Sequence, residues 1–238
     1  NYVSFASEAD RTRETWSLTP RLRWQHGLGS LKSETVAGID YYSGTVDATY
    51  TTSATQSAAQ DSLGFYIQNT TEFGAGWAGT VGARNQRVDQ SARQDAYLGF
   101  FGPQPGLEGS ADYSRNAWDL GLNYTGDGWR TYGKAGTTFR FATTDELFGY
   151  DPFTGNPTFA GDLKPQTGSL GELGGSLALG PVTGRAAVYL MILDAEIAYD
   201  GALFKNVNLA PTRRQGFELE ADWRIVSSLL ARASYTYA

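Results

Sequence analysis

The sequence predicts an all-β protein in which about ten antiparallel strands form a segment of an up-and-down transmembrane β-barrel. Strand-like segments carry apolar side chains on one parity and polar or charged side chains on the other. Short and long connections alternate along the chain, as tight periplasmic turns and long extracellular loops do in outer-membrane barrels. Tryptophans fall near the ends of the strand-like segments, which is typical of aromatic girdles at the two membrane interfaces.

The segment at residues 213–225 has the clearest alternation. Its charged side chains share one parity: Glu218, Glu220, Asp222 and Arg224. Its apolar side chains share the other: Phe217, Leu219, Ala221, Trp223 and Ile225. Such a strand suits a soluble sandwich with one buried face as well as a barrel wall between lipid and a polar lumen. The rest of the chain therefore has to distinguish the two folds.

Nine other segments read as strands in the same way. Together with residues 213–225 they give ten predicted strands, at approximately residues 15–25, 32–41, 63–73, 77–84, 118–124, 129–141, 172–179, 185–199, 213–225 and 229–238. Short turns are predicted at residues 27–30, 74–76, 126–128, 180–184 and 226–228. Long loops are predicted at residues 43–60, 89–115, 142–165 and 200–211. Pro20 is a local defect in the first strand, because proline donates no ladder hydrogen bond.

Composition excludes several classes of protein. The sequence has 238 residues and no cysteine, so a disulfide framework and a cysteine nucleophile are excluded. A net charge of −6 argues against nucleic-acid binding, which requires a basic face. His26 is the one histidine, which disfavours a catalytic triad or a multi-histidine metal site. No run of about 18 apolar residues predicts a transmembrane helix.

The tryptophans favour the membrane barrel over the soluble sandwich. Trp24, Trp77, Trp129 and Trp223 lie beside predicted short turns, and Trp16 and Trp118 lie toward the ends that carry long loops. All six share the less charged parity of their strands. Core tryptophans of a sandwich need not gather at strand ends, whereas interfacial tryptophans of a barrel do.

Several segments resemble those of TonB-dependent outer-membrane receptors. Residues 139–148, Phe-Arg-Phe-Ala-Thr-Thr-Asp-Glu-Leu-Phe, resemble the family's Phe-Arg-Ala-Pro-Thr…Glu-Leu-Phe/Tyr segment. Residues 156–167 contain Asn-Pro and Leu-Lys-Pro-Gln-Thr, similar to Asn-Pro…Leu-Lys-Pro-Glu-Thr. Asn208 with residues 213–220 resembles the Asn…Thr-Arg-Gly-Val-Glu-Leu-Glu strand, and residues 37–41 resemble another common barrel strand. The family's proline is missing after Phe141, and Gln166 replaces its glutamate.

The resemblance implies a TonB-energised uptake receptor for a ferric siderophore or a similar scarce nutrient, in the outer membrane of a Gram-negative bacterium. Such receptors enclose a plug domain in a barrel of about 22 strands. Residues 1–238 are therefore expected to be an internal fragment of the barrel domain, without the plug and the terminal strands. The implied partners are outer-membrane lipid, the plug, the TonB complex through the absent N-terminal region, and the ferric ligand. Val188, Leu190 and Ile192 are expected to face inward, toward the plug.

Aromatic residues of the predicted long loops are the candidates for ligand contact, because rigid aromatic side chains supply contact area at low entropic cost. They are Tyr97, Phe100, Phe101 and Tyr113 in the second loop, and Phe148, Tyr150 and Phe153 in the third. The alternative is that these residues pack the loops together or belong to the outer girdle.

No catalytic residue, metal site or cofactor is predicted. Asp145, Glu146, Asp151 and Asp162 offer oxygen ligands for calcium, but their spacing matches no calcium loop and favours solvated loop charges. Asp194 and Glu196 are expected to pair with arginine or lysine on the lumen wall.

Two other classes of protein remain as alternatives. A small outer-membrane barrel, porin-like or a surface protease, would need Asp and His together at the outer rim to be catalytic. His26 is predicted at the opposite end, beside a short turn. A soluble β-sandwich binding module is the third hypothesis.

Overall fold

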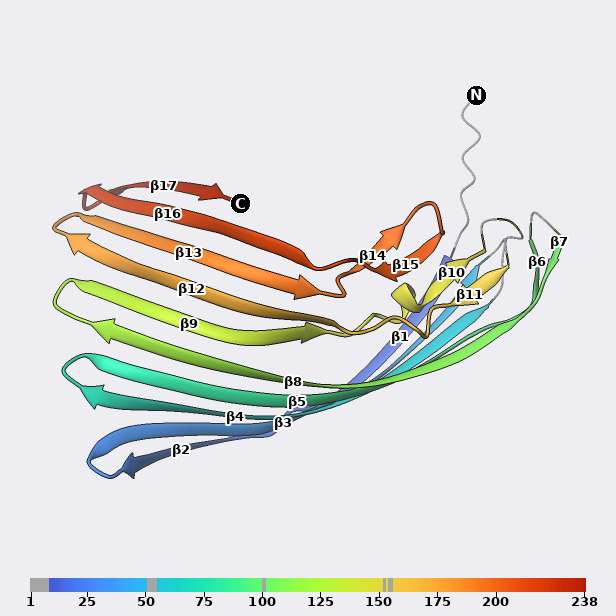
Figure 1. Cartoon of the computed structure of the whole chain (residues 1–238), viewed down its shortest axis with the longest axis horizontal. Helices are drawn as coiled ribbons and strands as arrows, with labels where there is room; N and C mark the ends of the chain where they lie inside the picture. Colours follow the sequence, from blue (N-terminus) through green and yellow to red (C-terminus); the bar gives the residue numbers. More distant parts are fainter. Residues whose placement is uncertain (1–8, 51–54, 100–101, 152, 154–155) are drawn as a thin grey trace.

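The computed structural model describes residues 9–50, 55–99, 102–151, 153 and 156–238. They form one curved, open, antiparallel sheet, with small hairpins gathered at one end and tight turns at the other (Figure 1). In the described residues the sheet has 11 strands in the order β1-β3-β4-β5-β8-β9-β12-β13-β16-β17, with β2 also paired to β3. Neighbours in the sheet follow each other along the chain, so the predicted up-and-down topology is confirmed.

The strands of the main sheet are long. They are β1 (Ala9–Leu18), β2 (Arg21–Leu28), β3 (Leu31–Tyr50), β4 (Gln56–Gly74), β5 (Trp77–Gln94), β8 (Leu107–Thr125), β9 (Trp129–Arg140), β12 (Gln166–Leu179), β13 (Val182–Asp194), β16 (Thr212–Val226) and β17 (Leu229–Tyr237). Three two-stranded hairpins pair β6 (Tyr97–Gly99) with β7 (Gly102–Gln104), β10 (Phe148–Tyr150) with β11 (Pro157–Phe159), and β14 (Ile197–Asp200) with β15 (Lys205–Asn208). One turn of 3-10 helix, η1 (Asp145–Leu147), precedes β10. No helix of the described residues has the length and apolarity needed to span a membrane.

Pro20 divides the first predicted strand into β1 and β2. Both halves pair with β3, and the carbonyl of Pro20 accepts a hydrogen bond of 3.1 Å from the backbone N–H of Ile39. Proline lacks the N–H that would continue the ladder, so the strand is interrupted while the sheet remains continuous.

The cross-strand register gives the sheet two distinct faces. We call the face that carries the paired charges and the β10–β11 hairpin the inner face, and the opposite face the outer face. Residues directly opposite each other share a face, so the pair of Val182 with Trp223 and the pair of Val81 with Leu120 lie on the outer face. All six tryptophans lie there too, with 42–60% of each residue exposed. The cross-strand register thus places the tryptophans of the predicted aromatic girdles on one face of the sheet.

Ion pairs line the inner face. Arg84 lies 2.7 Å from Asp40, Lys134 lies 3.0 Å from Glu172, and a carboxylate oxygen of Asp222 lies 2.9 Å from Arg185. These pairs join neighbouring or near-neighbouring strands, so these charged side chains are paired within the wall. A face of this kind suits a water-filled or plugged interior.

Val188, Leu190 and Ile192 lie on the outer face, and the expectation that they point inward is wrong. They oppose Phe217, Gln215 and Arg213, on the face that also carries Trp223. The inward assignment relied on Asp194 and Glu196, which follow at alternate positions in the sequence and would share the same face of a regular strand. Ala195, however, has a φ of 53°, which breaks the two-residue period before Glu196 is reached.

The predicted long loops at residues 43–60 and 89–115 are mostly strand, which is a second correction. β4 and β8 have 19 residues each, and β5 has 18, whereas a tilted strand needs only about 9–11 residues to cross a bilayer. In their distal halves the outer face becomes polar, while the inner face is buried and carries small apolar residues and glutamines. Val88 and Ala92 are buried on the inner face, while Arg87 and Arg93 are exposed on the outer face. A polar outer face carries no lipid-facing signal, so the sequence pattern resembles a loop.

Spin labels at matched neighbouring positions test the assignment of the two faces. Cysteines introduced singly at Leu120 and Leu219 should bring the label into contact with hydrocarbon, because both side chains are exposed on the outer face. In lipid bilayers these labels should collide with dissolved oxygen, while labels at Asp119 and Glu220 should collide with a water-soluble nickel chelate. Similar collision rates for the inner and outer members of each pair would contradict the assignment.

Candidate functional site at the outer mouth

The candidate site lies on the inner face, at the end of the sheet away from the short turns. There the segment between β9 and β12, described at residues 141–151, 153 and 156–165, folds back over the wall, and we call it the mouth insert. It consists of η1 and the β10–β11 hairpin, and the β14–β15 hairpin lies beside it (Figure 1). The predicted third loop is therefore a folded unit.

The mouth insert has its own apolar core. Leu147 is fully buried, and it packs with Ala142, Ala160, Leu163 and Ile197. Phe159 covers this core and lies where a side chain at Gly109 of β8 would stand. Burial of this apolar area stabilises the insert and its contact with β14, and Phe159 extends the packing to β8 of the wall.

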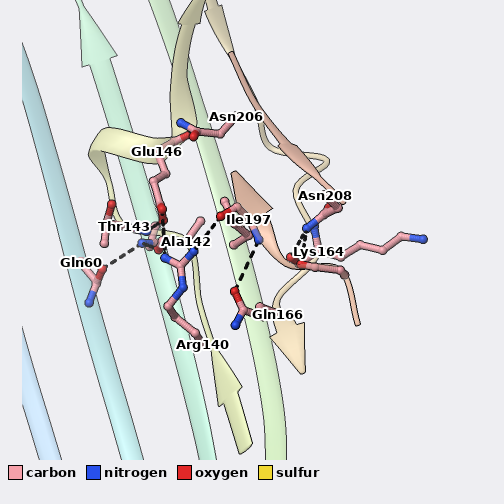
Figure 2. A network of polar contacts seen from close by, with 12 residues as sticks. Gln60, Arg140, Ala142, Thr143, Glu146, Lys164, Gln166, Ile197, Asn206 and Asn208 are labelled. Carbon is pink, nitrogen blue, oxygen red and sulfur yellow. Dashed lines mark hydrogen bonds and ion pairs between the residues drawn. The ribbon is translucent and has the colours of Figure 1, made fainter. Parts of the chain in front are cut away.

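Arg140 and Glu146 fasten the start of the insert. Nη1 of Arg140 lies 2.9 and 2.7 Å from the two carboxylate oxygens of Glu146, and Nη2 donates to the carbonyl of Ile197 at 3.3 Å (Figure 2). The backbone N–H of Thr143 donates to the same carboxylate at 2.8 Å. The carboxylate of Glu146 thus stabilises the turn before η1 and joins this turn to Arg140 at the end of β9. Arg140 also contacts β14 through the carbonyl of Ile197.

Two asparagines of the last hairpin complete the network. Nδ2 of Asn208 donates to the carbonyls of Lys164 and Ala195, both at 2.9 Å, and its Oδ1 accepts the N–H of Lys164 at 2.8 Å (Figure 2). Nδ2 of Asn206 donates to the carbonyl of Glu146 at 3.0 Å. The segments that carry the resemblance, at residues 139–148, 163–167 and 208, therefore meet in one network.

A row of glutamines on the inner face supports the insert from below. Gln90 donates to Gln60 and to the carbonyl of Ala142, both at 2.8 Å, and Gln56 donates to Gln94 at 2.6 Å. Gln90 and Gln94 are buried. The sequence reasoning missed these residues, although Gln86, Gln90 and Gln94 recur at one parity and so share a face.

Two of the predicted ligand-contact residues make aromatic contacts with the insert, Tyr113 from the wall and Phe148 from within the insert. Tyr113 belongs to β8; its ring stacks on Phe141 at 6.1 Å, and its hydroxyl donates to the carbonyl of Gly161 at 3.5 Å. Burial raises the pKa of Tyr113, and the nearby carboxylates of Asp162 and Asp112 add to this effect. Phe148 meets Phe159 edge to face at 6.3 Å.

The other predicted ligand-contact residues are spread out. Tyr97 begins the separate β6–β7 hairpin, Tyr150 ends β10, and Phe153 is 91% exposed. Phe100 and Phe101 lie outside the described residues. The structure thus brings Tyr113 and Phe148 to the insert, while Tyr97 belongs to another hairpin. Contact of any of these residues with a ligand stays a prediction.

The acidic residues have mainly structural partners. Glu146 is bound by Arg140, and within the described part of the chain no three metal-type side chains come together. Glu196 pairs with Arg214, as predicted, and accepts a hydrogen bond of 2.9 Å from Thr212. His26 lies on the outer face beside a short turn, stacked on Trp24 with 4.4 Å between ring centroids. It is far along the sheet from the acidic residues of the mouth, so the arrangement does not favour a protease.

Comparison with known proteins agrees with this geometry. A family model described as TonB dependent receptor-like, beta-barrel matches residues 1–238. No curated protein sequence matches the chain. Among solved structures, the chain resembles the ferric-catecholate import receptor Fiu from E. coli K12 in its closed form, with a TM-score of 0.74 and 12% identity over 97% of the chain.

Two further structures have the same fold. The ferric citrate transporter FecA in its unliganded form has a TM-score of 0.73 and 16% identity, and the copper transporter OprC has a TM-score of 0.72 and 18% identity, each over 97% of the chain. The chain spans 39% of the length of Fiu, 36% of FecA and 38% of OprC.

Replacement of Asn208 by aspartate should loosen the mouth insert. The change removes both N–H donors and places a carboxylate against two carbonyl groups, and each half-exposed hydrogen bond that is lost is worth about 1 kcal/mol. Hydrogen exchange at the amides of Leu163 and Lys164 should accelerate about tenfold or more. Asn116→Asp is the control, because Asn116 lies on the outer face and accepts a hydrogen bond from Asn85 through an oxygen that aspartate keeps. Equal protection of the insert in both variants would contradict the role given to Asn208.

Proposed function

Because the chain belongs to the TonB dependent receptor-like β-barrel family, we propose that it forms part of the wall and entrance of an outer-membrane receptor that takes up a ferric siderophore or a similar scarce nutrient. The family consists of transport receptors, and the chain is accordingly not an enzyme. The observation that carries the proposal is the mouth insert, which the Arg140–Glu146 pair and Asn208 fasten on the inner face of the sheet.

The wall below the insert supports a role in guiding a polar cargo. Its ion pairs join strands from β3 to β17, ending with Asp222 between Arg185 and Arg232. Near the short turns a cavity of about 290 Å³ opens on this wall, lined among others by Arg130, Glu218 and Glu220. We assign this lower wall to contact with a plug domain of the same polypeptide, whose polar surface would meet these charges.

The edges of the described sheet require further strands in the complete receptor. In hydrocarbon, unpaired backbone groups cost several kcal/mol each, so a spanning sheet has to close on itself. In this proposal the edge formed by β1 and β2 and the edge formed by β17 pair with strands of the remaining barrel, and residues 1–238 form an internal part of the barrel domain. Energy for uptake would come from the TonB complex, which would act through the plug.

In the simplest version of the proposal, the receptor takes up a scarce metal that is bound to an organic chelator. The solved structures named above are receptors or transporters for ferric catecholates, ferric citrate and copper. Their shared fold defines a transport class, and the side chains at the mouth have to select the cargo.

Uptake by the full-length protein tests the proposal. Cells that carry the complete receptor in the outer membrane should accumulate radioactive iron supplied as a ferric chelate, and a protonophore should stop this accumulation. A protein that is recovered outside the outer membrane, or uptake that persists without the proton gradient, would contradict the proposal.

The aromatic candidates for ligand contact can be tested in the same receptor. Phe153→Ala should weaken binding of the transported chelate about five- to tenfold, since a rigid exposed ring is lost from the mouth. Quenching of tryptophan fluorescence measures the affinity. Phe73→Ala removes an exposed ring next to a short turn and serves as the control, with no expected change in affinity. Equal affinities of the Phe153 variant and the parent would remove Phe153 from the candidate residues.

A further inference from the structure

A group of hydrogen-bonded polar side chains lies on the outer face, among mainly apolar neighbours. Its members come from β2, β3 and β4, and we call them the polar cluster: His26, Ser33, Thr35, Asn69 and Thr71. Thr35 opposes both Trp24 and Asn69, so the cluster shares the face of the tryptophans. Ser33 and Thr71 are buried, with 6% and 5% of each residue exposed. Polar groups on a lipid-facing surface are costly and often mark a functional site.

The hydrogen bonds of the polar cluster leave one N–H group over. Nδ2 of Asn69 donates its two hydrogens to Ser33 and Thr35, both at 2.9 Å. Oδ1 of Asn69 accepts the hydroxyl of Thr71 at 2.8 Å, and the hydroxyl of Ser33 donates to Thr71 across 2.7 Å. The hydrogen of Thr35 is then left to donate to Nε2 of His26 at 2.9 Å. This pattern places an N–H on Nδ1 of His26, which has no hydrogen-bond partner in the described part of the chain.

An apolar groove of about 560 Å³ begins beside the polar cluster on the same face. Its lining is shared between two members of the cluster and large apolar side chains: Asn69, Thr71, Leu28, Phe73, Leu120 and Leu173. A Cβ at Gly79 would lie 2.8 Å from the ring of Phe73, and one at Gly133 would lie 2.9 Å from Leu173. The two glycines thus let these side chains lie against the sheet, and the groove extends from β2 to β12.

The cluster and the groove lie at the depth of the membrane interface. Trp24, which belongs to the aromatic girdle near the short turns, stacks on His26 with 4.4 Å between the ring centroids. His26 lies two residues before the end of β2, which is about 7 Å along the strand. At this level the acyl chains of a bilayer meet the glycerol and headgroup region. A molecule here can present an oxygen to Nδ1 of His26 while its apolar chain lies in the groove.

We propose that the polar cluster and the groove bind one glycerophospholipid of the leaflet on the side of the short turns. The Nδ1–H of His26 donates to an ester carbonyl of the lipid, and an acyl chain fills the groove. An acyl chain gains little from the hydrophobic effect here, because the bilayer is as apolar as the groove. The hydrogen bond and the preformed shape of the groove therefore hold this lipid in preference to the surrounding ones. The inference goes beyond the uptake function and depends on the contact of the outer face with lipid.

Variants of His26 test the hydrogen bond in the full-length receptor with its plug. The receptor is stripped of lipid in detergent and titrated with dioleoylphosphatidylethanolamine, and native mass spectrometry counts the bound lipid. His26→Phe keeps a ring beside Trp24 but removes the N–H, so the affinity should fall about fivefold. His26→Gln keeps an acceptor for Thr35 and an N–H donor, so most of the affinity should remain. Equal losses in the two variants would contradict the hydrogen bond to the lipid.

A matched pair of substitutions tests the groove. Ala135 lines it on the outer face, so Ala135→Phe should fill the groove and weaken lipid binding about tenfold or more. Ala37→Phe is the control, because Ala37 lies on the outer face but does not line the groove, and this variant should bind like the parent.

Parent-like affinity of either His26→Phe or Ala135→Phe would overturn the inference. It would also be overturned by receptor dimers that dissociate in the Ala135→Phe variant, because a second copy would then occupy the groove. Each of these outcomes leaves the proposed uptake function standing, since lipid binding is measured without cargo.

Discussion

The backbone of a strand that crosses hydrocarbon must bond entirely to its neighbours, because no water is present to satisfy its N–H and C=O groups. The described sheet meets this demand with unbroken antiparallel ladders from β3 to β16. Its register shifts occur only beside short turns, between Glu72 and Gly74 and between Arg224 and Val226. Since one residue of slip would exchange the two faces, this continuity keeps the tryptophans and the inner-face ion pairs on opposite sides of the sheet.

Beyond the membrane the same strands meet different surroundings on each side. Their outer face becomes polar and exposed, as at Arg87 and Arg93, while their inner face is covered by the mouth insert. Gly109 leaves the space that the ring of Phe159 fills, and Gln90 bonds to the backbone of the insert. One continuous strand therefore serves as a lipid-facing wall at one end and as the support of a folded entrance at the other.

The sequence predicts those parts of the fold in which one face is uniformly apolar. The strands, the short turns and the face that carries the tryptophans are predicted by the alternation of apolar and polar side chains. This alternation arises because the lipid-facing side chains of a spanning strand have to be apolar. The prediction fails where that environment ends. Residues 43–50 and 89–94 continue their strands with polar outer faces, so their pattern resembles a loop. It also fails where one residue changes the parity, as Ala195 does ahead of Glu196.

The sequence predicts part of the candidate site, because the motifs that form it can be recognised. The sequence does not predict the structural role of these motifs. The family resemblance covers the segments around Arg140, Glu146 and Asn208. Some hydrogen-bond partners in these segments are distant in the sequence: Arg140 and Ile197 are 57 residues apart, and Asn208 and Lys164 are 44 residues apart. No local period connects positions so distant, so only the fold reveals that they form one network. The glutamine row was missed for a different reason, because a buried polar face has the same composition as an exposed one.

The motif residues are largely occupied with one another. Both N–H groups and the oxygen of the Asn208 amide have backbone partners, and the carboxylate of Glu146 is shared between Arg140 and Thr143. Side chains engaged in this way hold the insert in place and have little capacity left for cargo. The groups that the insert turns toward β1, among them Asp145 and Phe148, are outside this network. The motif residues therefore form a frame that positions the insert, and the side chains facing β1 are supported by this frame without being part of it.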